Sequence, residues 1–394
     1  MNKEKNLPDN WKNLRLIDVS KSIASGGTPR RNIKEYWENG DIPWLKISDL
    51  KSTYINKSME KITLKGLNNS STKLFPKGTI LYSIFATLGA IGILNFDSTT
   101  NQAIAGITPD NKIVETKYIY YCLKSERQNI IAKKSHATQD NINLKILKNH
   151  EMPIPPLNTQ HKIVKILENA EKMKLWRVKA ANLTNEYLKS LFMYTFGDPR
   201  DNSKLWDVVN FNKLAKIEKK SINPDSVDKN SNYIGLEHIE SETGRILNIM
   251  TVQEAGLKSN KYVFDEECVL YGKLRPYLNK VALPNFKGIS STDILPIKSI
   301  EGKSNKYFIK FLLSHPYYIK KSTEMSTGAN LPRISSKAIE KFKVYLPPVE
   351  LQNQFAEIIQ NVETLKNYQE QSKIQIDNLF NNLMQKAFKG ELTC

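Results

Sequence analysis

The feature that most constrains this chain is an internal duplication. Around residue 155 it reads Pro-Pro-Leu-Asn-Thr-Gln, and around residue 347 it reads Pro-Pro-Val-Glu-Leu-Gln. A shift of 192 residues maps Pro155 onto Pro347 and Gln160 onto Gln352. Further pairs related by this shift, or by one of 195 residues, are Ile142 with Ile334 and Trp11 with Trp206. One long repeat with small insertions indicates two copies of a single fold, not a solenoid of many short units.

Each copy has the same internal order. Mixed sequence rich in Ile, Tyr, Thr and turn dipeptides comes first and predicts short strands with interspersed helices. A Pro-Pro pair ends that pattern, and a long stretch without proline follows. We therefore expect an α+β protein in four segments. These are a mixed α/β domain at 1–155, a long helix at 156–200, a second mixed domain at 201–347 and a second long helix at 348–394.

The two proline-free stretches carry apolar residues at steps of three and four, which is typical of a helix-pairing seam. The seam falters at Arg177 and Thr184 in the first stretch, and at Gln369 and Ser372 in the second. At ~1.5 Å per residue each helix would run roughly 60 Å and overhang its own domain. We expect the helices to pair antiparallel, with one mixed domain at either end; packing of each helix on its own domain alone is the alternative. The predicted pairing positions are Ile163, Ile166, Ala170, Met173, Tyr187, Leu191, Phe355, Ile358, Val362, Leu365, Leu379 and Leu383.

The charge of the chain favours a polyanionic partner. Lys and Arg outnumber Asp and Glu by 58 to 40, a formal net charge of +18. Cations gain affinity for nucleic acid by releasing condensed counterions from phosphates. Solubility alone would also tolerate such a charge, so the surplus favours nucleic acid without excluding other functions.

One segment needs a membrane check, because residues 80–96 carry no charge. The segment is short for a span and is interrupted by Gly89 and Gly92, so two buried strands with a turn are expected. Its counterpart in the second copy, which begins at Leu270, holds Lys273 and Arg275. A membrane span would not tolerate these cations. The N-terminal residues 1–11 show no apolar stretch, so we expect no signal peptide, no membrane association and a cytoplasmic location.

Catalytic and metal-binding patterns do not stand out. The three cysteines are far apart, and the five histidines occur singly, so neither a disulfide framework nor a zinc site is expected. Both Pro-Pro pairs lack the preceding Asp or Asn that an amino-methyltransferase uses, and no phosphate-binding glycine motif occurs. A nuclease-like set of Asp207 with Glu218-Lys219-Lys220 arises easily by chance in a Lys-rich chain. We expect no catalysis and no cofactor in this chain.

Recognition of DNA remains, and it directs attention to loops that mix cations, aromatics and turn residues. The loop Ser25–Arg31 holds two glycines, which can let a backbone approach phosphate, and two arginines, which can grip guanine. The segments 271–280 and 326–333 have a similar mixture. For each cation the alternative is a solvated surface charge, and for each aromatic a core position, which is favoured for Trp44. The candidate DNA-contacting residues are Thr28, Arg30, Arg31, Lys46, Tyr82, Lys273, Arg275, Tyr277, Asn330 and Arg333.

Several of these stretches resemble the specificity subunit of a type I restriction–modification enzyme. They are Ser-Gly-Gly-Thr-Pro at 25–29, Glu-Tyr-Trp at 35–37, Gly-Asp-Ile-Pro-Trp-Leu at 40–45, Asn-Gln-Ala-Ile at 101–104, Tyr-Gly-Lys-Leu-Arg-Pro-Tyr at 271–277, and Leu-Pro-Pro at 346–348 with Gln352. The resemblance covers the whole chain, because that family also consists of two target-recognition domains alternating with two helical regions.

The resemblance implies a non-catalytic subunit that binds double-stranded DNA. Each recognition domain would read one half of a split target, while the paired helices set the gap and dock modification subunits. The twofold repeat suggests two such subunits. Those partners would bind S-adenosylmethionine and methylate adenine, and restriction subunits would add ATP- and Mg-dependent translocation and cleavage. Because Ser83–Ala86 differs from Gly272–Arg275, the two half-sites should differ.

Two other classes of function remain open on the residues alone. A stand-alone DNA nuclease or methyltransferase would require activity from the purified chain. A helical scaffold without sequence-specific DNA readout would show little salt dependence of DNA binding, whereas a specificity subunit should lose affinity in proportion to the phosphates it neutralises.

Overall fold

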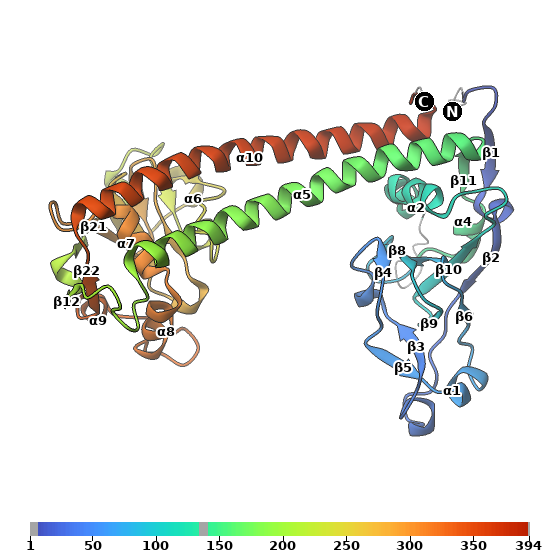
Figure 1. Cartoon of the computed structure of the whole chain (residues 1–394), viewed down its shortest axis with the longest axis horizontal. Coiled ribbons are helices and arrows are strands. Elements are labelled where there is room, and N and C mark those ends of the chain that lie inside the picture. The colour runs from blue at the N-terminus through green and yellow to red at the C-terminus, as the bar shows by residue number, and fades with distance from the viewer. Residues whose placement is uncertain (1–6, 134–140, 393–394) are drawn as a thin grey trace. The chain divides into compact units, whose positions relative to one another are not determined.

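The two Pro-Pro pairs each precede a long helix. In the computed structural model, which describes residues 7–133 and 141–392, α5 runs over Leu157–Phe196 and α10 over Val349–Lys389 (Figure 1). The chain divides into two compact units: unit 1 holds residues 1–177 and 372–394, and unit 2 holds residues 178–371. Each unit therefore contains one mixed domain and a part of both helices. Residues 1–6, on which part of the signal-peptide expectation rests, and Cys394 lie outside the described residues.

Unit 1 contains two mixed sheets and one short antiparallel pair. The first sheet has the order β2-β10-β7-β8-β4, the second β5-β3-β9-β6, and the pair is β1-β11. The strands are β1 (Lys12–Arg15), β2 (Ser20–Ser25), β3 (Ile42–Leu45), β4 (Tyr54–Ile55), β5 (Glu60–Ile62), β6 (Leu74–Phe75), β7 (Ile80–Ser83), β8 (Ile91–Leu94), β9 (Ser98–Thr100), β10 (Ile104–Pro109) and β11 (Glu151–Ile154). The shorter helices are α1 (Leu64–Asn68), α2 (Thr116–Ser125), α3 (Arg127–Ala132) and α4 (Leu144–Lys148).

Unit 2 repeats this arrangement. Its sheets have the orders β13-β21-β18-β19 and β14-β17-β20-β15-β16, and its short pair is β12-β22. The strands are β12 (Asp207–Asn210), β13 (Ala215–Ile217), β14 (Ser221–Ile222), β15 (Asn232–Ile234), β16 (Met250–Thr251), β17 (Lys261–Phe264), β18 (Cys268–Gly272), β19 (Val281–Ala282), β20 (Gly288–Ser290), β21 (Ile294–Ser299) and β22 (Lys343–Leu346). The shorter helices are α6 (Val252–Ala255), α7 (Lys306–Leu313), α8 (Pro316–Glu324) and α9 (Ser336–Glu340).

The strand pairing confirms the duplication. In unit 1, β10 lies between β2 and β7, and β3 runs parallel to β9. In unit 2, β21 lies between β13 and β18, and β15 runs parallel to β20. The units differ at their sheet edges, where β4 is added in unit 1 and β14 in unit 2. The α+β prediction with an internal repeat is correct.

The uncharged segment 80–96 forms the buried strand β7 and the strand β8, joined by a turn that contains Gly89 with φ +76°. The prediction of two strands is therefore confirmed. Among the described residues, no helix combines the length and the apolar character needed to cross a bilayer.

Both long helices contribute to the core of each unit. In unit 1, Ile163 and Leu167 of α5 pack in one cluster with Phe380 and Met384 of α10. In unit 2, Leu188 and Phe192 of α5 share a cluster with Phe355 and Ile359 of α10. The N-terminal part of α5 thus packs with the C-terminal part of α10, and the C-terminal part of α5 packs with the N-terminal part of α10. Within each unit the helices therefore pair antiparallel, as the sequence predicted (Figure 1).

Candidate nucleic-acid interface

The loop Ser25–Arg31 is held closely by its own domain. Gly26 and Gly27 are buried, and their N–H groups donate to the carbonyl oxygens of Ile104 (3.0 Å) and Thr100 (2.9 Å). A Cβ on Gly26 would lie 2.1 Å from Thr100 Oγ1, and one on Gly27 would lie 2.5 Å from Ser71 Oγ. The glycines therefore serve internal packing, and their N–H groups are engaged within the domain.

Arg31 is fixed by aromatic and acidic neighbours. Its guanidinium carbon lies 3.7 Å from the ring centroid of Trp37 and 4.6 Å from that of Trp44, while Nη1 lies 2.5 Å from Glu60 Oε2. Cation–π contacts and an ion pair together hold the side chain in place. Trp44 is 2% exposed and donates Nε1–H to the Gly27 carbonyl at 2.9 Å, so the core position favoured for it is confirmed.

The other candidates in or near this loop differ in how freely they face solvent. Lys46 also pairs with Glu60, and Thr28 donates its hydroxyl to Gln102 Oε1. Burial alone would raise the pKa of Glu60, but hydrogen bonds from Lys46 and Arg31 bring it below its ordinary value. The side chain of Arg30 is exposed and has no ion pair among the described residues. In unit 1, Arg30 is therefore the least restrained of the predicted cations.

Tyr82 is misplaced among the DNA candidates. It lies on β7, is fully buried (0% exposed) and belongs to the unit 1 core. Burial raises the pKa of its hydroxyl to about 12. On a strand buried on both faces, an aromatic side chain faces the core whichever way it points, so Tyr82 has no DNA-facing position.

In unit 2, the candidates gather where β18 ends and residues 326–333 return to it. Leu274 forms an isolated β-bridge with Arg333, and the Arg275 N–H donates to the Pro332 carbonyl at 2.7 Å. Arg275 has the left-handed backbone angle φ +51° and precedes the 3-10 turn η7 (Pro276–Leu278). Arg275 and Asn330 are exposed, and Tyr277 is 48% exposed. We call Arg275, Tyr277 and Asn330 the exposed edge of unit 2.

Two predicted cations of unit 2 face one carboxylate, Asp293, that sequence reasoning missed. Arg333 makes a bidentate contact with Asp293, with Nε–Oδ1 at 2.9 Å and Nη2–Oδ2 at 3.1 Å. Lys273 Nζ lies 3.9 Å from Asp293 Oδ1. Glu60 has the same role toward Arg31 and Lys46 in unit 1 and was also missed. An isolated acidic residue in a basic chain gives no sequence signal of its partners, which here lie 20 and 40 residues away from Asp293.

The backbone of this part of unit 2 has a close counterpart in unit 1. Phe85 forms an isolated β-bridge with Asn141, as Leu274 does with Arg333. Ala86 has φ +56°, close to the +51° of Arg275. The segment 134–140, which corresponds to 326–332, lies outside the described residues. The two units thus present one backbone arrangement with different side chains.

The helix-pairing prediction is correct in direction but partly wrong in phase. Ile163, Ala170 and Phe355 are buried, and Leu191, Val362 and Leu383 pack partly buried against the two cores. Ile166 and Ile358 are only half-buried. Met173, Tyr187, Leu365 and Leu379 are between 41% and 52% exposed and lie outside the seam.

Polar residues make contacts between the two helices near those positions. In unit 1, Lys174 Nζ lies 2.8 Å from Asp377 Oδ1 across the two helices. In unit 2, Gln369 is 9% exposed and donates Nε2–H to Thr184 Oγ1 at 3.0 Å. Thr184 and Gln369, two of the four interrupted positions noted in the sequence, therefore form a contact between the helices.

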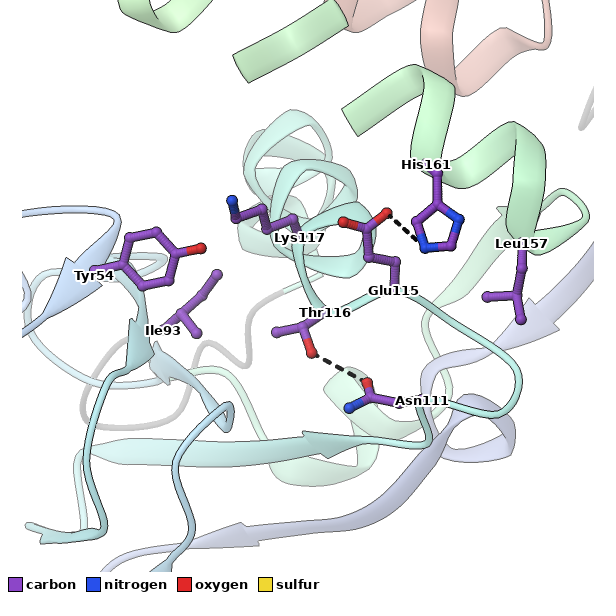
Figure 2. A pocket seen from close by; sticks show the side chains of 8 residues that line it. All are labelled: Tyr54, Ile93, Asn111, Glu115, Thr116, Lys117, Leu157 and His161. Atoms are coloured by element: carbon purple, nitrogen blue, oxygen red, sulfur yellow. Dashed lines mark hydrogen bonds and ion pairs between the residues drawn. The ribbon is translucent and has the colours of Figure 1, made fainter. Parts of the chain in front are cut away.

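A pocket of about 380 Å³ lies in unit 1 beside the start of α2 (Figure 2). His161 and Glu115 face one another in it: His161 Nε2 lies 3.7 Å from Glu115 Oε2, and burial raises the pKa of Glu115. Thr116 donates its hydroxyl to Asn111 at 3.2 Å. None of the predicted DNA-contacting residues lines this pocket. Its lining residues are Tyr54, Ile93, Asn111, Glu115, Thr116, Lys117, Leu157 and His161.

Within residues 7–133 and 141–392, no group of three or more His, Cys, Asp or Glu is arranged to hold a metal ion. Of the nuclease-like set, Glu218 pairs with Lys216 at 3.2 Å, and Lys219 bonds to Ser336 Oγ. Glu218 and Lys219 are thus engaged in contacts within unit 2.

Comparison with known proteins places these features in a family. The type I restriction modification DNA specificity domain matches residues 8–183 and 200–378. The type I restriction enzyme MjaIX specificity subunit of Methanocaldococcus jannaschii is 26% identical over 421 residues, covering 98% of this chain and 94% of that protein. The EcoR124I/EcoR124II specificity subunit of Escherichia coli is 34% identical over 169 residues, 41% of each chain.

The fold is also known. A chain from a study of the structural basis of complex assembly and conformational transition of the type I R-M system superposes with a TM-score of 0.64 at 16% identity. The superposition covers 98% of this chain and 100% of that one. The duplicated arrangement of both units therefore matches an existing fold over its whole length.

Proposed function

The chain belongs to the family of type I restriction–modification DNA specificity domains, and from this premise we propose that each half of it reads one half of a split, asymmetric DNA target. In this proposal, residues 1–155 and 201–347 are the recognition domains, and residues 156–200 and 348–394 are the helical spacers. As a specificity subunit, the chain is the non-catalytic part of its restriction–modification complex.

One observation carries the asymmetry of the target. Ala86 and Arg275 have nearly the same left-handed backbone angle, and the bridges Phe85–Asn141 and Leu274–Arg333 correspond. Arginine at such a position can form two hydrogen bonds with guanine, whereas alanine can only make apolar contact with a base. Two copies of one backbone with different side chains would read two different half-sites.

The DNA contacts we propose follow from exposure and charge. In unit 2 they are the residues of the exposed edge, Arg275, Tyr277 and Asn330, with Lys273 near by. In unit 1, Arg30 is the first candidate, and Thr28, Arg31 and Lys46 are held beside it by Gln102 and Glu60. Contacts restrained in this way would position phosphates, while the unrestrained arginines would reach bases.

The outer faces of the helices support docking of modification subunits, and we propose two of them, one to each unit. The apolar side chains left outside the seam are the natural contact area, because exposed apolar groups of this size mark interaction surfaces. In unit 1 they are Met173, Leu175, Trp176, Ile374 and Leu379, and in unit 2 they are Val178, Leu183, Tyr187, Tyr194, Leu365 and Tyr368.

The partners would supply the chemistry. In this proposal the modification subunits bind S-adenosylmethionine and methylate adenine, restriction subunits use ATP and Mg, and the complex works in the cytoplasm on double-stranded DNA. This chain itself would hold no cofactor.

A methylation map tests the proposal. The chain is co-expressed with its modification subunit in a host without adenine methylation, and modified adenines are sequenced with and without the chain. A gapped, asymmetric motif that depends on the chain is expected. A motif that persists without the chain would show that the partner reads DNA by itself.

A further inference from the structure

We propose that Arg333 and Asp293 form a clamp that positions the exposed edge of unit 2, and that Arg333 does not itself read a base. This inference rests on the proposed function, since it assigns roles within one reading surface. It makes Asp293 a specificity-determining positioning residue, although a carboxylate would otherwise be expected to oppose DNA binding.

The side-chain contacts of Asp293 are the first evidence for the clamp. Both oxygens of Asp293 accept hydrogen bonds from Arg333, at 2.9 Å and 3.1 Å, and Lys273 adds a second positive group at 3.9 Å. The Asp293 side chain is 23% exposed and that of Arg333 is 41% exposed. Bidentate arginine–carboxylate pairs are geometrically specific. The hydrogen bond to Asp293 also raises the pKa of Arg333.

Backbone hydrogen bonds are the second evidence for the clamp. Thr327 and Arg333 exchange two hydrogen bonds, Thr327 N–H to Arg333 O at 3.0 Å and Arg333 N–H to Thr327 O at 2.9 Å, which closes residues 327–333 into a loop. That loop then bonds to the end of β18 through Arg275 N–H to Pro332 O at 2.7 Å and Ile334 N–H to Lys273 O at 3.1 Å. Fixing the Arg333 side chain on Asp293 therefore fixes Asn330 beside Arg275.

Arg333 and Arg275 differ in the contacts that they would lose on binding DNA. Arg333 would have to abandon a bidentate ion pair and leave a half-buried carboxylate without its partner, which is unfavourable. Among the described residues, Arg275 makes only one long side-chain contact, from Nη2 to the Asn330 carbonyl at 3.5 Å. Arg275 can therefore turn to a base edge without losing a strong interaction.

The clamp belongs to unit 2 alone. The equivalents of Lys273, Asp293 and Arg333 in unit 1 are Ile84, Ala103 and Asn141, because the same backbone hydrogen bonds join them: Ile84 N–H to Ala103 O and Ile142 N–H to Ile84 O. None of these three carries a charge. The half-site read by unit 1 is therefore an internal control for any change to the clamp.

The decisive variant is Asp293→Asn in the full chain, co-expressed with its modification subunit. Methylation is measured on target libraries with single base changes in either half-site, and the half-site of unit 2 is the one that Arg275→Ala alters. The clamp predicts that discrimination in that half-site falls roughly tenfold while the other half-site is unaffected. Asp198→Asn, which removes the carboxylate from another arginine pair elsewhere in unit 2, is the matched control and should leave both half-sites unchanged.

A charge swap separates the clamp from direct reading. Asp293→Arg with Arg333→Asp keeps the ion pair but removes the cation from position 333, so the clamp predicts better discrimination than Asp293→Asn alone. Retained or sharper discrimination in Asp293→Asn would overturn the clamp, because it would mean that a released Arg333 reads DNA. Retained discrimination in the unit 1 half-site verifies folding. Absence of any motif that depends on the wild-type chain would instead refute the proposed function.

Discussion

Two buried glutamines show how much a single residue contributes to this architecture. Gln160 donates Nε2–H to the Pro155 carbonyl at 2.8 Å and accepts from the Glu115 N–H at 2.8 Å. Gln352 donates to the Pro347 carbonyl at 2.9 Å and accepts from the Asn305 N–H at 3.3 Å. Both are 0% exposed and join the start of a long helix to the segment that enters α2 or α7. The residues that first revealed the duplication thus connect each helix to its domain.

We expect Gln352→Leu to destabilise unit 2 by about 2–3 kcal/mol, because a buried N–H group and two carbonyl groups lose their partner. Thermal unfolding with hydrogen exchange of the peptide around Asn305 measures this effect. Gln354→Leu, two residues along the same helix and exposed, is the matched control and should change stability little. Equal effects of both substitutions would refute the role of the buried amide.

Arg275 is the residue at which we expect reading to be most sensitive. Arg275→Ala should relax one base position in one half-site by roughly tenfold or more and leave the other half-site intact, because one bidentate contact is lost. Methylation of single-substitution libraries measures it, with Arg200→Ala as a control for loss of an exposed positive charge in unit 2. A uniform loss over both half-sites would mean that Arg275 contacts phosphate only.

At the scale of elements, the long helices follow the predicted period, and the predicted phase holds at the ends of the helices but not at Met173, Tyr187, Leu365 and Leu379. The sequence pattern placed Thr184 and Gln369 on the seam as interruptions, and there they form a hydrogen bond between the helices, while Lys174 pairs with Asp377 across them. The hydrogen bond from Gln369 to Thr184 satisfies a buried amide in one alignment of the helices, so it favours that alignment over neighbouring ones. Apolar residues outside the seam are then available to a partner.

Two adjacent residues of α5 allow packing in the core to be tested separately from docking of a partner. Leu188 is 2% exposed in the unit 2 core, and Tyr187 is 52% exposed. Leu188→Asp should destabilise unit 2 by about 3–4 kcal/mol, since it buries an unpaired charge. Tyr187→Asp should leave unfolding unchanged but weaken binding of the modification subunit, measured by co-purification and sedimentation. Unimpaired complex formation by Tyr187→Asp and by Leu365→Asp would rule out the outer face as the docking surface.

For the molecule as a whole, features with a long sequence signature were predictable and features made by tertiary contacts were not. The repeat, the Pro-Pro helix starts and the strands within 80–96 followed from periodicity and punctuation. The roles of Gly26, Arg31 and Tyr82 did not, because each depends on neighbours distant in sequence: Thr100, Glu60 and the unit 1 core. Within the candidate site, the exposed edge of unit 2 could be located from its mixture of cations, aromatics and turn residues. Asp293, which pairs with Arg333 beside that edge, could not.

The largest-scale prediction concerns the gap in the DNA target. In the proposed function the long helices set this gap, and because backbone hydrogen bonds fix the rise per residue of a helix, they would not stretch to follow a changed spacing. Adding or removing one base pair shifts the half-sites by about 3.4 Å and also rotates one against the other. We therefore expect methylation to fall at least roughly tenfold at either altered gap, since one unit loses its base contacts.

Base substitutions within a gap of unchanged length should have no effect, and these form the control. Equal methylation across gap lengths would mean that the helices do not set the spacing and that the two units find their half-sites independently.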